Sequence, residues 1–332
     1  MNKKLKIKDL LMNNVLYVIM ILIVIAIALI SPKFLSFRVL RDILNQSSIR
    51  LLVALGVLFV IISGNADLSG GRLVGLTAVV AGTLAQSATT TLKFFPNLPE
   101  LNPFIGIAVA VLLGLLVGIL NGLIVSKLRV PAFLATLGTQ MIIYGANCLF
   151  IALPPNQSQP LAGLTDAFRN IGTGNIFGVN YIIIISILAA IFVWLFLTKT
   201  TLGKEIFAVG GNPEAAKVSG INVFKITLIT YAIAGAFYGL AGALECARTG
   251  SANSSYGLGY ELDAIASCII GGCSASGGIG SVPGVFLGVV IFNVINYGLT
   301  FIGLSSYWQY VVKGLIIIFA IALDIRKYTK KD

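Results

Sequence analysis

About ten apolar stretches of membrane-spanning length make up most of this 332-residue chain. A helix that crosses the hydrocarbon core of a bilayer needs about 20 mostly apolar residues. Only 11% of the residues are charged, against ~25% in soluble domains. The sequence therefore predicts an all-α polytopic membrane protein with one transmembrane domain over residues 1–332. The predicted spans lie near residues 15–30, 49–64, 73–87, 104–125, 132–153, 180–198, 226–245, 260–273, 282–300 and 307–323.

Two of these spans, 73–87 and 260–273, are short and lie next to glycines. We expect each of them either to cross the bilayer or to form a broken or re-entrant helix. Irregular backbone survives at membrane depth only where protein covers it or where it lines a cavity. The Gly-rich segments at 63–71 and 271–280 are also compatible with an internal repeat, which the sequence alone leaves open.

The basic residues indicate how the chain is oriented. The net charge is +11, and with ten spans 15 of the 23 Lys and Arg residues fall on the side that holds both termini. Cytosolic loops carry an excess of Lys and Arg, so both termini are predicted to be cytosolic. No basic groove with interleaved aromatic residues is present, which argues against nucleic acid as a partner. The longest periplasmic loop, at 154–179, is either a contact for an external partner or a passive connector.

The cysteines do not form a metal-binding pattern. The chain has no His and no C-x-x-C pair. Structural zinc sites need about four Cys or His ligands. The four cysteines are therefore predicted to be small buried hydrophobic residues, and we expect neither a metal site nor a catalytic site. They are Cys148, Cys246, Cys268 and Cys273.

One motif resembles part of an ATPase and is misleading. The run from Leu68 to Arg72 is similar to the Leu-Ser-Gly-Gly-Gln signature of ABC ATPases. An ATPase also needs a Walker loop, in which Gly-Lys is followed by Ser or Thr. The only Gly-Lys pair, at Gly203 and Lys204, is followed by Glu205. The sequence therefore predicts no ATPase site in this chain, and we expect it not to be an enzyme.

The largest charged segment is a cytosolic loop at 199–225, and it contains a strong helix start. Asn212 suits a helix N-cap, Pro213 suits the first helical position, and Glu214 complements the positive end of the helix dipole. Gly220 lies where a left-handed C-terminal cap is expected. Such a short helix is marginal in water, so it must dock either on its own membrane domain or on a soluble partner.

The pattern Glu214-Ala-Ala-x-x-x-Gly220 resembles the Glu-Ala-Ala loop of bacterial ABC importer permeases, which inserts into a cleft of the ATPase subunit. The Ile-x-Leu-Pro part that follows in that loop is missing here. The branch of the family that serves ribose, galactose and related sugars also lacks it, and its loops are similar to residues 210–221 here. Resemblance to this branch covers nearly the whole chain, at 46–50, 67–76, 260–266, 295–300, 307–310 and 313–314.

The resemblance implies a permease subunit of a binding-protein-dependent ABC importer, with that family's architecture, in the bacterial cytoplasmic (inner) membrane. It implies three protein partners: a cytosolic ATPase subunit that uses ATP and Mg, a periplasmic sugar-binding protein, and a second permease copy in a homodimer. This chain itself would bind no cofactor. Galactose or a methyl-galactoside is the expected monosaccharide; ribose, another pentose or a nucleoside is the alternative. The ATPase-coupling residues are expected to be Gly211, Asn212, Pro213, Glu214, Ala215, Ala216 and Gly220.

Polar residues near the spans are candidates for the translocation pathway. Sugars are uncharged, so hydroxyl, amide and aromatic side chains suit their passage. Asp67 and Asp263 border Gly-rich breaks, while Asn293 and Asn296 share one helical face. The alternative for each residue is interhelical hydrogen bonding or ion pairing, with Lys313 beside an acidic residue of a neighbouring helix. The candidate set is Asn65, Asp67, Ser69, Asp263, Asn293, Asn296 and Tyr297.

An ATP-independent secondary sugar carrier is the alternative from another functional class. Such a carrier would use carboxylates in a strongly apolar midplane environment to couple sugar movement to an ion. Carboxylates in that setting are poorly represented in the sequence. The acidic residues closest to the spans are Asp67, Glu245, Glu261 and Asp263.

Overall fold

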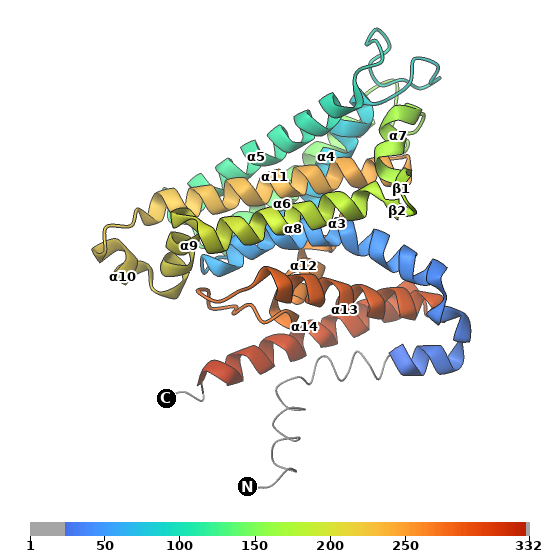
Figure 1. Ribbon diagram of the computed structural model, residues 1–332. Helices are drawn as coiled ribbons and strands as arrows, with labels where there is room; N and C mark the ends of the chain where they lie inside the picture. Colours follow the sequence, from blue (N-terminus) through green and yellow to red (C-terminus); the bar gives the residue numbers. More distant parts are fainter. Residues whose placement is uncertain (1–23, 330–332) are drawn as a thin grey trace.

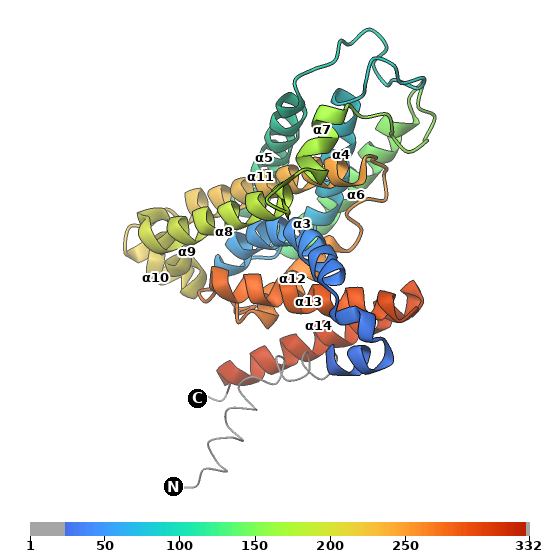
Figure 2. The same cartoon turned by 45° about the vertical axis from the view of Figure 1, so that its right-hand side comes forward.

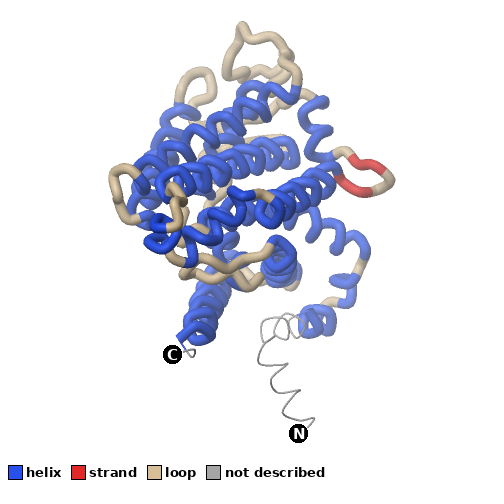
Figure 3. The backbone as a smooth tube through the Cα atoms, turned by 60° about the vertical axis from the view of Figure 1, so that its left-hand side comes forward, coloured by secondary structure: helices blue, strands red, loops and turns tan. Residues whose placement is uncertain are grey.

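The computed structural model describes residues 24–329, and nearly all of its regular structure is helical (Figures 1 and 3). Residues 24–30 are helical, so most of the predicted first span lies outside the described residues. One short antiparallel hairpin pairs Asn175 with Asn180. The elements are η1 (Pro32–Leu35), α3 (Phe37–Ile62), α4 (Gly70–Leu84), α5 (Pro103–Ser126), α6 (Ala132–Ala152), α7 (Asp166–Thr173), β1 (Asn175–Ile176), β2 (Val179–Asn180), α8 (Tyr181–Lys199), α9 (Thr201–Gly211), α10 (Pro213–Val218), α11 (Val223–Thr249), α12 (Tyr260–Ile270), α13 (Val282–Phe301) and α14 (Ser306–Thr329).

Six of the described helices are long and apolar enough to cross a membrane: α3, α5, α6, α8, α11 and α13. The prediction of an all-helical membrane protein is confirmed, but the number of about ten spans is not. The difference lies partly in α4 and α12, which have 15 and 11 residues. At about 1.5 Å per residue they reach roughly 22 and 16 Å, less than the hydrocarbon thickness of about 30 Å.

Helices α3 and α11 form the centre of the molecule. Helices α12, α13 and α14 lie mostly on one side of these two, and α4, α5, α6 and α8 lie mostly on the other, with α4 and α12 meeting where they begin (Figures 1 and 2). Glycines bring α11 very close to α5, because a Cβ added at Gly114 would overlap the carbonyl oxygen of Gly235. Small residues at four-residue spacing allow this close approach of two helices.

The two ends of the bundle carry different elements. One end holds α9, α10 and the C-terminal part of α14, and the other holds α7 and the β1–β2 hairpin (Figure 1). The distribution of Lys and Arg assigns the α9–α10 end to the cytosol. We refer to the α7 end as the outer end.

Helices α4 and α12 begin inside the protein, side by side, and run in opposite directions. The chain enters α4 from the end of α3 through residues 63–69, and enters α12 from the end of α11 through residues 250–259. A Cβ added at Gly257 would overlap the carbonyl oxygen of Gly71, so the two starting segments are in backbone contact. The break that precedes α12 is therefore at 250–259, whereas the Gly-rich segment noted at 271–280 follows this helix.

Candidate coupling surface and translocation pathway

The short cytosolic helix predicted from the sequence is α10. Asn212 caps it, with its side-chain oxygen accepting a hydrogen bond from the Ala215 N–H at 2.9 Å. Pro213 occupies the first turn, and Gly220 has a φ of +87° just beyond the helix. These local signals therefore set both ends of the helix as expected.

Helix α10 projects from the cytosolic end and is mostly exposed (Figures 1 and 2). Ala216 is its one buried residue, and the side chain of Val218 is 90% exposed. A six-residue helix with so few contacts to its own domain gains little stability from packing. The surface that α10 offers is available to a partner.

A groove of about 1030 Å³ lies between α10 and the body of the protein. Glu214 and Lys217 line it from α10, and Arg129 lines it from the turn between α5 and α6. The half-buried Asn65, a pathway candidate, lies on the opposite wall with Ser276. The groove thus places one pathway candidate beside the coupling helix at the cytosolic end.

A junction of backbone contacts joins the α9–α10 connection to the rest of the bundle. A Cβ added at Gly210 would overlap the carbonyl oxygen of Ile62, the last residue of α3, and would lie 2.7 Å from the Gly278 nitrogen. The Gly278 N–H donates a hydrogen bond to the same Ile62 oxygen at 2.9 Å. A Cβ added at Gly277 would lie 2.6 Å from the Cα of Gly64. The base of the coupling helix therefore touches the segments next to α4 and α12.

Asp67 and Ser69 hold the extended segment before α4 in place. The Asp67 Oδ1 atom accepts hydrogen bonds from the Ser69 N–H (2.9 Å) and hydroxyl (2.7 Å). Asn121 of α5 donates to the Ser69 hydroxyl at 2.8 Å, and the Tyr231 hydroxyl of α11 donates to the Ala66 carbonyl at 2.8 Å. Asp67 and Ser69 are both buried. These contacts satisfy the irregular backbone that an interrupted span leaves inside the membrane.

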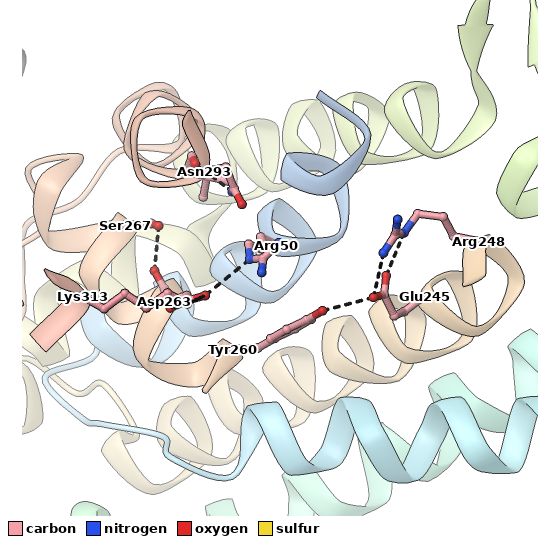
Figure 4. Close-up of polar contacts among 9 residues, drawn as sticks. Arg50, Glu245, Arg248, Tyr260, Asp263, Ser267, Asn293 and Lys313 are labelled. Atoms are coloured by element: carbon pink, nitrogen blue, oxygen red, sulfur yellow. Dashed lines mark hydrogen bonds and ion pairs between the residues drawn. The ribbon is translucent and has the colours of Figure 1, made fainter. Parts of the chain in front are cut away.

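Asp263, in the first turn of α12, is paired with two cations from other helices (Figure 4). The Lys313 ammonium on α14 lies 3.0 Å from both carboxylate oxygens. The Nε atom of Arg50, midway along α3, lies 3.4 Å from Oδ2. The predicted pairing of Lys313 with an acidic residue on another helix is confirmed. Charges at membrane depth are costly unless they are paired in this way.

A second ion pair lies on α11 and is linked to the first (Figure 4). Glu245 accepts two hydrogen bonds from Arg248, at 3.0 and 2.9 Å, and one from the Tyr260 hydroxyl at 3.1 Å. The Arg50 guanidinium carbon lies 4.9 Å from the centre of the Tyr260 ring. The contacts therefore run without a gap from Arg248 at the outer end of α11 to Asp263.

The candidates on α13 lie toward α3. The Asn293 amide donates to the Val289 carbonyl of its own helix at 2.9 Å. The Tyr297 hydroxyl donates to Asp42 Oδ2 on α3 at 3.3 Å. Asn296 lies between them in sequence, and its Nδ2 atom is buried with no hydrogen-bond partner among the described residues. Asp67 and Ser69 bond to each other, and Ser69 bonds to Asn121 of α5, so the seven candidates form more than one group.

Sequence reasoning missed the partners that complete these groups. Arg50, Arg248 and Asp42 were not singled out, although each is a charged residue close to an apolar stretch. Arg248 follows Glu245 by three residues, a spacing that favours ion pairs on a helix and could have revealed this pair. Arg50 and Asp263 are 213 positions apart, and no local signal connects them.

A polytopic helical bundle with two interrupted spans and a projecting cytosolic helix has the architecture of a membrane permease. Residues 39–321 match the family described as "Branched-chain amino acid transport system / permease component", and the chain belongs to this family. It is a multi-pass protein of the bacterial inner membrane.

The chain is similar over nearly its whole length to curated sugar permeases. It is 47% identical over 320 residues to the galactose/methyl galactoside import permease protein MglC of Escherichia coli K12, with 95% of each chain covered. Identity to the protein of that name from Haemophilus influenzae is 45% over 327 residues, with 97% of each chain covered. The ribose import permease protein RbsC of Escherichia coli K12 is 37% identical over 313 residues, covering 93% of this chain and 92% of the relative. No solved structure matches the chain.

Proposed function

We propose that this chain is the permease subunit of a binding-protein-dependent ABC importer that moves galactose or methyl galactosides into the cell. The observation that carries the proposal is the 47% identity over 95% of the chain to a galactose/methyl galactoside import permease, against 37% to a ribose import permease. A separate ATPase subunit supplies the energy by using ATP and Mg, and a periplasmic sugar-binding protein delivers the sugar at the outer end.

Helix α10 is the element that receives the ATPase. The exposed residues around Glu214 enter a cleft of that subunit, and Ala216 anchors the helix to its own domain. Movement of α10 passes through Gly210 to the end of α3 and to the loop after α12, because these backbones are in contact. Such contacts suit a rigid-body switch between two discrete packings. The coupling residues are Gly211, Asn212, Pro213, Glu214, Ala215, Ala216 and Gly220.

The candidate pathway residues divide into three roles in this proposal. Asp263, Asn293, Asn296 and Tyr297 follow the route of the sugar along α12 and α13. Asn65 lies at the cytosolic exit, in the groove beside α10. Asp67 and Ser69 shape the break before α4, between these two regions, through their hydrogen bonds to each other.

In this arrangement a second copy of the chain covers the face of α6 that points away from the rest of its own bundle. The exposed residues of α5 are apolar, as lipid contact requires, whereas polar groups lie beside the middle of α6. The Arg72 guanidinium lies 4.1 Å from the centre of the Tyr144 ring, and the Gln140 amide lies 3.4 Å from Glu261. A Cβ added at Gly138 would meet no atom within 4 Å, which leaves room for a close helix contact.

Reconstitution in proteoliposomes tests the proposal. Vesicles that contain the permease, its ATPase and the delivery protein should accumulate labelled galactose when ATP is present, and should accumulate ribose much more weakly. Vesicles with the permease alone should not concentrate either sugar. Uphill transport by the permease alone would contradict the proposal and identify a secondary carrier, while a preference for ribose would overturn only the substrate.

A further inference from the structure

A polar cavity of about 280 Å³ opens at the outer end of the bundle, between α3, α7, α11 and α13. Six polar side chains contribute most of its lining, and they come from four separate segments of the chain. They are Asp42, Asn45, Gln46, Asn180, Arg248 and Tyr297.

The chemistry of this lining fits a small uncharged ligand with several hydroxyl groups. A carboxylate, amides, a guanidinium and a phenol supply both hydrogen-bond donors and acceptors in a small space. The volume is close to the lower end of the roughly 300–1,000 Å³ that is typical of ligand pockets. That space suits one sugar ring.

The charged groups of the cavity are held in fixed positions. Asp42 accepts a hydrogen bond from the Tyr297 hydroxyl at 3.3 Å. Arg248 uses Nε and Nη2 for its two hydrogen bonds to Glu245, which leaves Nη1 available for a ligand. A Cβ added at Gly172 of α7 would overlap the backbone of α11 at Arg248, so α7 closes this wall tightly.

One residue of the cavity lining carries an unpartnered polar atom. The Asn45 Oδ1 atom is buried and has no hydrogen-bond partner among the described residues. A buried amide without a partner costs about 1–3 kcal/mol. The Asn45 side chain therefore retains hydrogen-bonding capacity that its packing within the described residues does not use.

The cavity is connected to the start of α12. Arg248 pairs with Glu245, which accepts from Tyr260, whose ring lies beside the Arg50 guanidinium (Figure 4). Arg50 in turn lies 3.4 Å from the Asp263 carboxylate. A ligand that contacts Arg248 therefore touches the outer member of a contact chain that reaches the centre of the bundle.

We propose that this cavity is an outer subsite for the transported sugar, in which Asp42, Asn45 and Arg248 bind its hydroxyl groups. The inference rests on the proposed function and adds the site at which the permease itself first contacts the monosaccharide.

The test compares ATP-driven uptake of galactose with uptake of its monodeoxy derivatives by the assembled transporter, with the delivery protein at saturation. The variants are Asp42→Asn and Asn45→Ala. The matched control is Asp166→Asn, which removes the same charge from a fully exposed residue at the start of α7, outside the cavity. Gln46→Ala provides a second cavity variant if Asp42→Asn does not fold.

The cavity variants should reduce galactose uptake about tenfold, the effect of losing one hydrogen bond to a charged or buried group. Their preference for galactose over one monodeoxy derivative should fall toward one, while Asp166→Asn keeps the wild-type preference. Unchanged preference in all folded cavity variants would overturn the subsite. A wild-type transporter that takes up no sugar with ATP would instead contradict the proposed function.

Occupancy is tested separately with Gln46→Cys and a membrane-impermeant thiol reagent. Saturating galactose should slow labelling of this cysteine in permease that is free of the delivery protein. Equal labelling rates with and without galactose would count against the subsite, because the ring would then not enter the cavity.

Discussion

At the scale of single residues, the ion pairs at membrane depth are the most sensitive positions. The Asp263 side chain is only 4% exposed, and Lys313 provides its closest cation. In the Lys313→Met variant the carboxylate keeps only the longer contact to Arg50. A hydrogen bond to a charged group contributes about 1.5–3 kcal/mol, so losing the Lys313 contacts should lower the melting temperature of the purified permease in detergent by several degrees.

Two further variants separate the ion pair from a general effect of charge. Lys225→Met removes a charge from an exposed residue at the start of α11 and should leave the melting temperature unchanged. Adding Asp263→Asn to Lys313→Met should lower the melting temperature further, because Arg50 then loses its carboxylate partner and remains as an uncompensated charge. A wild-type melting temperature in Lys313→Met alone would show that Arg50 is a sufficient partner.

The sequence predicted some members of these polar groups but not others. An isolated Lys inside an apolar span must be paired, so a partner for Lys313 followed from the cost of burying a charge. The second cation on Asp263 did not, because Arg50 is brought there only by the packing of α3 against α12. Asp67 was chosen for its place beside a glycine-rich break and Ser69 for its hydroxyl group, and the structure adds the hydrogen bonds that fix that break.

At the scale of elements, the junction at Gly210 determines whether movement of α10 reaches the bundle. The variant Gly210→Ala places a methyl group against the Ile62 carbonyl and 2.7 Å from the Gly278 nitrogen. The backbones must then separate, while the exposed residues of α10 stay unchanged. The ATPase should still bind, and the amount of sugar moved per ATP hydrolysed should fall severalfold.

A glycine outside the coupling segment provides the control for this prediction. Gly314 lies in α14, and a Cβ added there meets no atom within 4 Å. The variant Gly314→Ala should therefore keep both ATPase binding and the ratio of sugar to ATP. Equal ratios in the two alanine variants would contradict a role for the Gly210 contact in coupling.

Local and long-range signals explain which elements the sequence could predict. The capping Asn, the Pro and the Glu of α10 lie in consecutive positions, so this helix was predictable from a few residues. The starts of α4 and α12 depend on contact between Gly71 and Gly257, which are far apart in sequence. An apolar stretch indicates burial but not whether a helix begins halfway across the membrane, and this is part of the reason why the count of ten spans was not confirmed.

At the scale of the whole molecule, the exposed face of α5 is apolar whereas that of α6 carries polar groups, and this difference predicts which face meets a second copy. Polar groups in the middle of the α6 face would contact hydrocarbon in a single copy, at a cost that contact with another protein removes. Cysteine crosslinking tests this arrangement in membranes that contain the complete transporter. Met141→Cys, at a residue 69% exposed on α6, should form a covalent dimer under mild oxidation. Leu188→Cys, at a residue 60% exposed on α8, should remain monomeric.

The crosslinking background carries Cys148→Ser, because Cys148 lies on α6 and is half-buried, whereas the other three cysteines are buried. A disulfide requires Cα atoms within about 7 Å, so dimer formation at Met141→Cys reports close approach of the two α6 helices near a symmetry axis. Crosslinking through Leu188→Cys instead would place the second copy on α8 and leave the polar groups around Arg72 without a protein partner. In that case the contact of Arg72 with the Tyr144 ring and its attraction to Glu261, both within one chain, would alone have to offset the cost of placing these polar groups in lipid.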